Sequence, residues 1–280
     1  EGRWPVLMTR LPYGKDLPIG SALLDPVQAT RRGYVVVVQD TRGTGTSEGE
    51  WYPFIYEAWD GVDAIAWAAS LPYSDGQVGM YGASYFGFTQ WSAAKHQPPA
   101  LKALVPFQTW RDPLNGMGAR GGALELGTVA NWNLGMGMNV LMRRYAGSPQ
   151  TLGAALRVWA DEMDALGAQG YWSLPLNEFA PLRRQEVAPS FFDMLVAPND
   201  PSAEPVASAT IAGHLAGVQT PSYNIGGWYD IFLGDTIAAY LAMRAAGAPA
   251  KLLIGPWSHS EQGGRVGQRN FGQAAQSGLI

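Results

Sequence analysis

Ser84 is the residue whose setting points most clearly to nucleophilic chemistry. It stands in the run GASYFG at 82–87, between a short apolar stretch at 78–81 and a predicted helix over 86–95. A strand, a tight turn and a helix are what a nucleophile elbow requires, because small neighbours permit the strained turn and the helix N-terminus offers N–H groups to an oxyanion. The usual G-x-S-x-G spacing would place a glycine where Phe86 stands. A serine that caps the helix is therefore the alternative interpretation.

A serine nucleophile needs a general base, most often histidine, and the chain has three. His96 follows the helix predicted over 86–95, where the helix dipole favours a basic residue. His214 precedes a predicted strand and suits a surface or packing position. His259 comes just after a strand predicted over 251–256, at the sheet edge where open α/β folds place their chemistry. We therefore expect His259 to be the base.

The third member of such a site is an acid that orients the histidine and stabilises its protonated form. Asp230 ends the run GGWYD at 226–230, directly after a predicted strand. The order serine, aspartate, histidine along the chain is that of the α/β-hydrolases. Asp235 is better explained as a helix-start residue, and Asp40 precedes Ser84, so both are weaker candidates.

Alternating strands and helices are predicted to hold these residues in place. The predicted strands span 5–9, 35–38, 78–81, 101–107, 221–227 and 251–256, and the predicted helices span 57–69, 86–95, 129–145, 151–166 and 235–246. This alternation indicates an α/β fold with a mostly parallel sheet. Four consecutive valines at 35–38 suggest a strand covered on both faces.

The residue composition and pattern change between the fourth and fifth predicted strands. The stretch has few β-branched runs, two helical segments and loops broken by Pro and Gly. We expect a first part of the α/β core at 1–110, a helical cap insertion at 111–214 and a second part of the core at 215–280.

Composition excludes several other classes of function. The net charge is -4 with no basic block, so nucleic-acid binding has no electrostatic support, and no apolar run is long enough to span a bilayer. There is no cysteine and the three histidines are far apart, so we expect neither a metal nor another cofactor. A dinucleotide fingerprint after 35–38 fails because Glu48 replaces the required glycine. The pairs at 143–144 and 183–184 are interpreted as solvated arginines.

Five sequence motifs together resemble one family. They are PYGK at 12–15, VQDTRG at 38–43 with SEG at 47–49, GMYGASY at 79–85, GGWYD at 226–230 and GPWSH at 255–259. In this order they are similar to the cocaine-esterase and X-prolyl dipeptidyl aminopeptidase group of α/β-hydrolases, in which G-x-S-Y-x-G is the normal form. The resemblance implies an α/β-hydrolase core, an inserted helical cap and a C-terminal jelly-roll. The jelly-roll and the first part of the core are expected to be absent from this chain.

The resemblance also implies roles for individual residues. Ser84 would be the nucleophile, Asp230 the acid and His259 the base. The backbone N–H of Tyr85 and the hydroxyl of Tyr13 would form the oxyanion hole. A phenol suits that role because it stays protonated at neutral pH and donates directionally.

Phe232 and Trp132 match positions that line the acyl pocket in that family, and 11 Trp and 12 Tyr suit a pocket for apolar ligands. The expected function is hydrolysis of ester or amide bonds in a small molecule through an acyl-enzyme on Ser84, with a carboxylesterase-type activity as the first choice. An X-prolyl dipeptidyl aminopeptidase acting on short peptides is the alternative. A non-catalytic binding module is the alternative of another class.

The peptidase alternative would require an anionic partner for a free amino group, and Glu125, Glu162 and Glu178 are the available candidates. The sequence neither predicts nor excludes assembly into a homo-oligomer. A compartment is not fixed by the sequence, with the cytoplasm as the default expectation.

Overall fold

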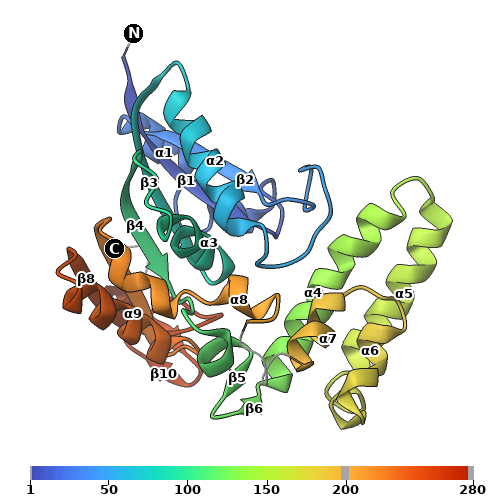
Figure 1. The fold of residues 1–280 in the computed structure, drawn as a ribbon. Coiled ribbons are helices and arrows are strands. Elements are labelled where there is room, and N and C mark those ends of the chain that lie inside the picture. The colour runs from blue at the N-terminus through green and yellow to red at the C-terminus, as the bar shows by residue number, and fades with distance from the viewer. Residues whose placement is uncertain (1, 197–201, 277–280) are drawn as a thin grey trace.

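The computed structural model describes residues 2–196 and 202–276 and is built on one six-stranded sheet (Figure 1). The sheet has the strand order β2-β1-β3-β4-β7-β8, and every neighbouring pair in it is parallel. Its strands are β1 (Trp4–Leu11), β2 (Val35–Asp40), β3 (Ser74–Ala83), β4 (Leu101–Phe107), β7 (Ser222–Tyr229) and β8 (Ala250–Ser258). The predicted α/β class with a mostly parallel sheet is confirmed.

Helices connect the strands and flank the sheet. They are α1 (Pro26–Arg31), α2 (Glu57–Ser70), α3 (Tyr85–Ala94) and α9 (Leu233–Ala245). Helix α1 was not predicted, although its start is encoded locally: Asp25 accepts hydrogen bonds from the N–H groups of Val27 and Gln28, and Pro26 occupies the first turn. Six residues are too few for a visible hydrophobic period.

The prediction for 35–38 was wrong about burial. These residues do form a parallel strand, but β2 lies at one edge of the sheet and, among the described strands, pairs only with β1. Its four valines are half-buried rather than covered on both faces. A run of β-branched residues favours a strand, but it does not determine where in the sheet that strand lies.

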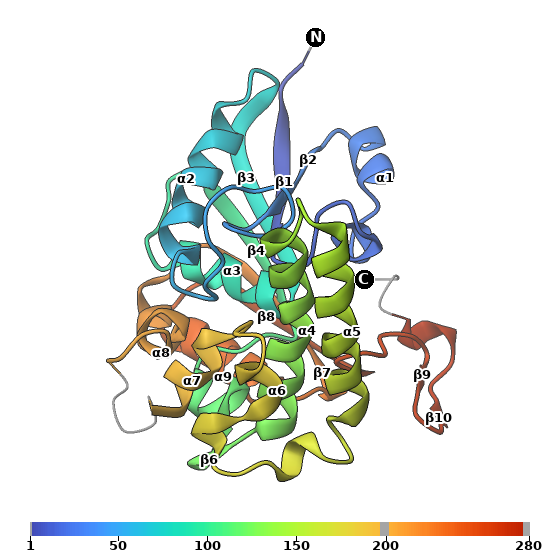
Figure 2. The same ribbon diagram turned by 90° about the vertical axis from the view of Figure 1, so that its right-hand side faces the viewer.

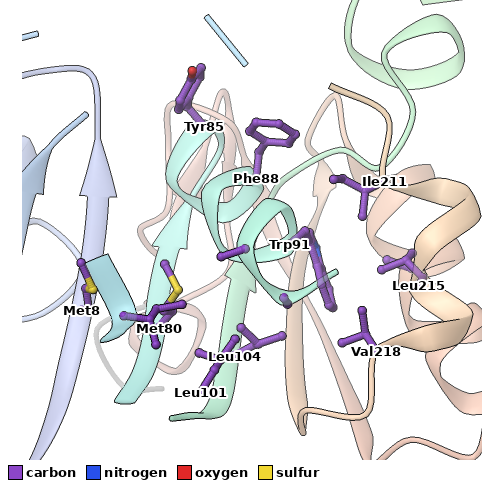
Figure 3. Close-up of a cluster of buried hydrophobic side chains, with 14 of the residues drawn as sticks. Met8, Met80, Tyr85, Phe88, Trp91, Leu101, Leu104, Ile211, Leu215 and Val218 are labelled. Carbon is purple, nitrogen blue, oxygen red and sulfur yellow. The ribbon is translucent and has the colours of Figure 1, made fainter. Parts of the chain in front are cut away.

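The main core forms where α3 packs on the centre of the sheet (Figure 3). All ten residues of α3 are buried, and Trp91 is only 1% exposed. The helix contacts β1, β3 and β4, and Leu101 and Leu104 of β4 belong to the same cluster. Ile211 and Leu215, from the segment that leads into β7, complete it. Because α3 is buried all round, its first turn is held rigidly against the end of β3.

The chain between β4 and β7 is mainly helical and has a second core. Its helices are α4 (Leu126–Arg144), α5 (Pro149–Ala165), α6 (Ala180–Arg183), α7 (Pro189–Val196) and α8 (Val206–Ala209). Figure 2 shows α4 and α5 side by side, and a separate apolar cluster joins α4 to α6 and α7. Two short hairpins, β5 (Ala119–Arg120) with β6 (Ala123–Leu124) and β9 (Arg265–Val266) with β10 (Arg269–Asn270), complete the strands. The boundaries predicted at 110/111 and 214/215 stay a prediction.

The two arginine pairs are exposed, as expected for solvated residues, and their guanidinium groups also make specific contacts. Arg143 donates to the carbonyls of Gly45 and Gly49, and so ties α4 to the loop after β2. Arg144 donates to the carbonyls of residues 185 and 186. Arg183 lies over the ring of Phe192, 3.8 Å from its centroid, and Arg184 pairs with Glu162. Their charged ends remain at the surface, but their positions are fixed by the helices.

Candidate active site

Ser84 occupies the sharp turn between β3 and α3 in a conformation that residues other than glycine rarely adopt, with φ 54° and ψ -123°. Its backbone N–H donates to the carbonyl of Phe107, which fixes the turn to the end of β4. A Cβ at Gly82 would lie 2.7 Å from Phe86, and one at Gly87 would lie 2.7 Å from Thr109. The glycines around Ser84 are therefore required by the close approach of Phe86 to Gly82 and of the Thr109 side chain to Gly87.

The alternative interpretation of Ser84 as a helix cap does not match its geometry. Ser84 immediately precedes α3, but its side chain makes no capping hydrogen bond to that helix. Its Oγ instead lies 3.0 Å from Nε2 of His259. The side chain is therefore directed toward the histidine rather than toward the helix.

Ser84, His259 and Asp230 form one continuous hydrogen-bonded line. Nδ1 of His259 lies 2.6 Å from Oδ1 of Asp230, whose other oxygen accepts from the N–H of Phe232 at 2.8 Å. The Asp230 side chain is fully buried, while the His259 side chain is 31% exposed. In the tautomer that donates from Nδ1 to the carboxylate, His259 has a lone pair on Nε2 that can accept from the serine hydroxyl. The three residues come from the turns that follow β3, β7 and β8, at the carboxyl edge of the sheet.

The other two histidines lie elsewhere. His96 follows α3 and stacks on Trp59 of α2, with 4.2 Å between ring centroids. Burial lowers the pKa of His96, and the neighbouring Lys95 and His214 act in the same direction. His214 is exposed in a short 3-10 turn, Ala212–Gly217. Neither histidine has a hydrogen bond to Ser84.

Of the two alternative acids, Asp40 organises the loop that carries Tyr13. It accepts hydrogen bonds from the backbone N–H and the ammonium group of Lys15, at 2.6 and 2.9 Å, and from the N–H of Thr46. Burial acts to raise the pKa of Asp40, but these hydrogen bonds and the Lys15 charge outweigh it, so the pKa is lowered. Asp40 therefore has a positioning contact on the Tyr13 side of the site and no contact with His259.

Asp235, the other alternative, lies in the first turn of α9 as its sequence context suggested. Its Oδ1 is 3.4 Å from Nε of Arg111. Burial raises the pKa of Asp235 to about 6 despite this arginine. It is a buried carboxyl group with a structural partner of its own.

The Tyr13 hydroxyl, predicted as an oxyanion donor, belongs to a side chain that lines the same cavity as Ser84. The hydroxyl accepts a hydrogen bond of 3.0 Å from Nε1 of Trp132. Burial raises the pKa of Tyr13 to about 12, and the bond from Trp132 acts only partly against it. The phenol therefore keeps its proton and can donate a hydrogen bond to a developing negative charge.

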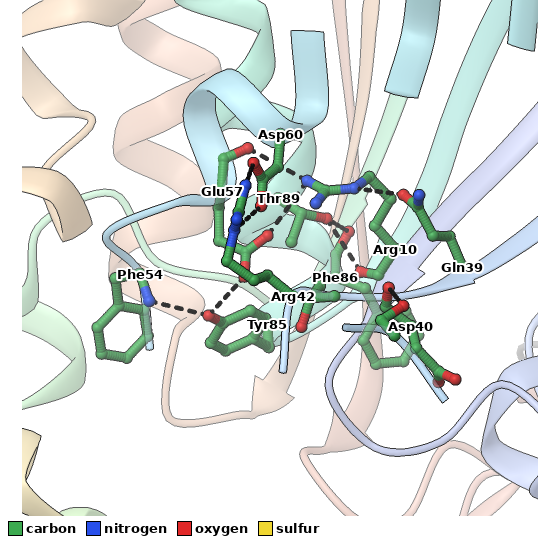
Figure 4. Close-up of polar contacts among 12 residues, drawn as sticks. Arg10, Gln39, Asp40, Arg42, Phe54, Glu57, Asp60, Tyr85, Phe86 and Thr89 are labelled. Atoms are coloured by element: carbon green, nitrogen blue, oxygen red, sulfur yellow. Dashed lines mark hydrogen bonds and ion pairs between the residues drawn. The ribbon is translucent and has the colours of Figure 1, made fainter. Parts of the chain in front are cut away.

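Tyr85 is anchored by a buried polar network that the sequence did not reveal (Figure 4). Its hydroxyl donates to Oε1 of Glu57 and accepts from the N–H of Phe54, both at 2.9 Å. The other oxygen of Glu57 is 3.1 Å from Nη1 of Arg10, and both side chains are buried. Burial raises the pKa of Tyr85 well above its usual value, and that of Glu57 rises for the same reason. This network anchors Tyr85, the residue that follows Ser84 directly and begins α3.

A cavity of about 390 Å³ opens onto Ser84, Tyr13 and His259. Its walls are largely aromatic or apolar and include Phe54, Trp110, Met117, Trp132, Met194, Ile231 and Phe232. Phe232 meets the His259 ring edge to face, with 5.2 Å between centroids. Both aromatic residues predicted to line a pocket thus line this one, while Phe54, Trp110 and the two methionines were not anticipated.

None of the described residues that line the cavity is acidic. Glu125 pairs with Arg120 at 3.0 Å, and Glu162 pairs with Arg184. Glu178 lies in a short 3-10 turn, Leu176–Glu178. The three glutamates considered as anchors for an amino group are therefore all outside the cavity.

Within the two described ranges, no three His, Asp or Glu side chains are grouped to hold a metal ion. In the same part of the chain, no helix combines the length and the apolar character needed to cross a bilayer.

The fold is similar to those of solved hydrolases. An α-amino acid ester hydrolase matches with a TM-score of 0.64 and 22% identity, over 98% of this chain and 47% of that chain. A CocE/NonD family hydrolase from Staphylococcus aureus matches with a TM-score of 0.60 and 22% identity, over 91% of this chain and 41% of that chain. At these identities the likeness shows the fold.

Sequence comparison gives a closer relationship. The chain is 35% identical to the cocaine esterase of Rhodococcus sp. (strain MB1 Bresler) over 281 residues, which cover 98% of this chain and 47% of that protein. The chain thus spans about half the length of this curated relative. The sequence model of the X-Pro dipeptidyl-peptidase (S15) family matches residues 1–261. The resemblance predicted from the five motifs is confirmed, and the chain belongs to the S15 family of X-Pro dipeptidyl-peptidases.

Proposed function

We propose that this chain carries the catalytic site of a serine esterase. The observation that supports this most directly is the unbroken line from Asp230 through His259 to the Ser84 hydroxyl. As Ser84 Oγ attacks an ester carbonyl, Nε2 of His259 accepts its proton, and the Asp230 carboxylate stabilises the imidazolium that forms.

The negative charge on the former carbonyl oxygen is stabilised by two donors, the Tyr13 hydroxyl and the Tyr85 N–H. Collapse of the tetrahedral intermediate expels the alcohol, which takes the proton from His259, and leaves an acyl-enzyme on Ser84. A water molecule then attacks the acyl carbon while His259 acts again as base, and the second intermediate releases the acid.

The cavity favours an uncharged acyl group with substantial apolar surface. Its aromatic walls would bury such a group, whereas a free amino terminus would lose water without gaining a carboxylate partner. This contrast favours an ester substrate over the X-prolyl dipeptidyl aminopeptidase reaction that the family description names. The name of the curated relative, cocaine esterase, also supports an ester.

Parallel assays with nitrophenyl esters of increasing acyl size and with Xaa-Pro nitroanilides test this proposal. We expect hydrolysis of the esters, with the specificity constant rising as the acyl group fills the cavity, and little cleavage of the anilides. Preferential cleavage of Xaa-Pro nitroanilides would instead support the peptidase. Absence of turnover together with absence of reaction with serine-directed probes would support a non-catalytic module.

A further inference from the structure

Gln108 lies between the two loops of the site and is fully buried, with 0% of its surface exposed. It follows β4 directly and has a positive φ of 46°, a conformation that costs free energy for a residue with a side chain. Its backbone N–H donates to the carbonyl of Ile225 in β7 at 2.7 Å. Its backbone carbonyl accepts from the N–H of Ser84 at 3.2 Å. The main chain of Gln108 thus contacts the nucleophile turn itself.

The side chain of Gln108 reaches the other loop. Its Nε2 donates to the carbonyl of Ser258, the residue before His259, at 3.1 Å. Its Oε1 accepts from Nε2 of Gln262 at 2.9 Å, and that same nitrogen is 3.4 Å from the carbonyl of His259. The carboxamide therefore holds the His259 loop both before and after the histidine.

The surrounding sheet leaves room for this carboxamide. A Cβ at Gly227 would lie 2.7 Å from Nε2 of Gln108 and 2.2 Å from the carbonyl of Trp257. The register between β7 and β8 shifts between Gly227 and Tyr229, at the level where Gln108 bonds to Ser258. The regular backbone hydrogen bonding between β7 and β8 is interrupted there. The side chain of Gln108, which follows β4, donates a hydrogen bond to β8 at that point.

We propose that Gln108 is a positioning residue that keeps the His259 loop in register with the Ser84 turn. The inference rests on the proposed function, because it concerns the distance between His259 Nε2 and Ser84 Oγ. A displacement of about 1 Å between reacting groups can lower a rate by on the order of 100-fold. Loss of the carboxamide should therefore reduce turnover without altering the cavity that binds the acyl group.

The test compares Gln108→Met, which keeps the length of the side chain and removes both hydrogen-bonding ends, with the wild-type chain. Three quantities are measured: kcat and KM on a nitrophenyl ester, the rate of inactivation by a fluorophosphonate, and Tm. We expect kcat and the inactivation rate to fall by roughly 10- to 100-fold, with KM unchanged within about twofold. Gln262→Ala removes only one partner of the carboxamide, so it should give a smaller decrease that is not additive with Gln108→Met.

Asn224 provides a matched control. It is also a buried amide of the same sheet, and its Nδ2 donates from β7 to the carbonyl of Lys251 in β8 at 3.3 Å. Asn224→Leu should lower Tm and leave the inactivation rate of the folded protein unchanged, because its bond lies at the opposite end of β8 from His259.

The outcomes separate this inference from the proposed function. If the wild-type chain is labelled and Gln108→Met reacts at the wild-type rate, the positioning role is wrong and the proposed function stands. If Gln108→Met and Asn224→Leu lose reactivity in proportion to their loss of Tm, Gln108 has only a structural role. If Gln108→Met does not fold, the folded Gln262→Ala variant decides: a wild-type inactivation rate there overturns the inference. A wild-type chain that no serine-directed probe labels would overturn the proposed function itself.

Discussion

The carboxyl edge of the sheet and the helices between β4 and β7 contribute to the same cavity in different ways. The sheet edge provides Ser84, Asp230 and His259, joined by hydrogen bonds of 2.6 and 3.0 Å. The helical segment provides mainly apolar walls, among them Val129 and Met194. Under the proposed function, the sheet edge would supply the reacting groups, and the helices would supply part of the wall that selects the acyl group.

Trp132 is the point at which the two regions meet. It belongs to α4 and lines the cavity, yet its indole N–H donates to the Tyr13 hydroxyl, which comes from the loop after β1. A polar bond between Tyr52 and Asp193 and the contacts of Arg143 also join the helices to the loop after β2. A substitution at most positions should therefore change either the rate or the preference among acyl groups, whereas a substitution at Trp132 should change both.

Tyr13→Phe should have the largest effect among variants outside the proposed triad. It keeps the ring and removes one proposed oxyanion donor, so kcat for a small ester should fall by roughly 100-fold with a small change in KM. Steady-state kinetics on nitrophenyl acetate measure this.

Tyr81→Phe is the matched control for that variant. Tyr81 lies in β3, and its buried hydroxyl has no hydrogen-bond partner among the described residues. Its removal should leave kcat unchanged. Equal effects of the two variants would contradict an oxyanion role for Tyr13.

Trp132→Phe should have an intermediate effect, because it keeps an aromatic wall and removes the bond to Tyr13. A single hydrogen bond contributes about 1 kcal/mol, so kcat should fall by about fivefold, and selectivity among acyl groups should also change. Trp159→Phe removes an indole bond to the carbonyl of Leu134, away from the cavity, and serves as the control. A change in KM alone for Trp132→Phe would show that Trp132 acts only as a wall.

Asp235→Asn should change stability rather than rate. Burial raises the pKa of Asp235 from 3.8 to about 6. The protonated carboxyl group of Asp235 is favoured in the folded state, so its contribution to the free energy of unfolding is fully present below pH 3.8. This contribution is lost as the pH rises through about 6. The stability of the variant relative to the wild-type chain should therefore be greater at pH 7.5 than at pH 4.5, by at most about 2 kcal/mol.

Thermal unfolding of both proteins at the two pH values measures this difference, and titration of all other groups cancels in the comparison. An equal difference in Tm at both pH values would show that the carboxyl group of Asp235 is not strained by burial.

The sequence was sufficient where the signal is local. The strand, turn and helix around Ser84 were predicted from neighbouring residues, and the order of Asp230 and His259 followed from the ends of two strands. In the structure His259 lies in hydrogen-bond contact with both Ser84 and Asp230. Trp132 donates to Tyr13, and these two residues were predicted from the family resemblance.

Prediction failed where the partner of a residue comes from a distant element. Nothing in the sequence indicated that Glu57, the first residue of the helix predicted over 57–69, lies buried between Arg10 and Tyr85. Gln108 gave no signal at all, because its partners Ser258 and Gln262 are about 150 residues away along the chain. The valines of β2 indicated a strand without indicating that it lies at the edge of the sheet.

The identity of the nucleophile is the central claim, and mapping the site of fluorophosphonate attachment by mass spectrometry tests it most directly. We expect one adduct per chain, on Ser84, and none in Ser84→Ala, which should also lose esterase activity while keeping its Tm. An adduct on another residue, or activity retained by Ser84→Ala, would contradict the account.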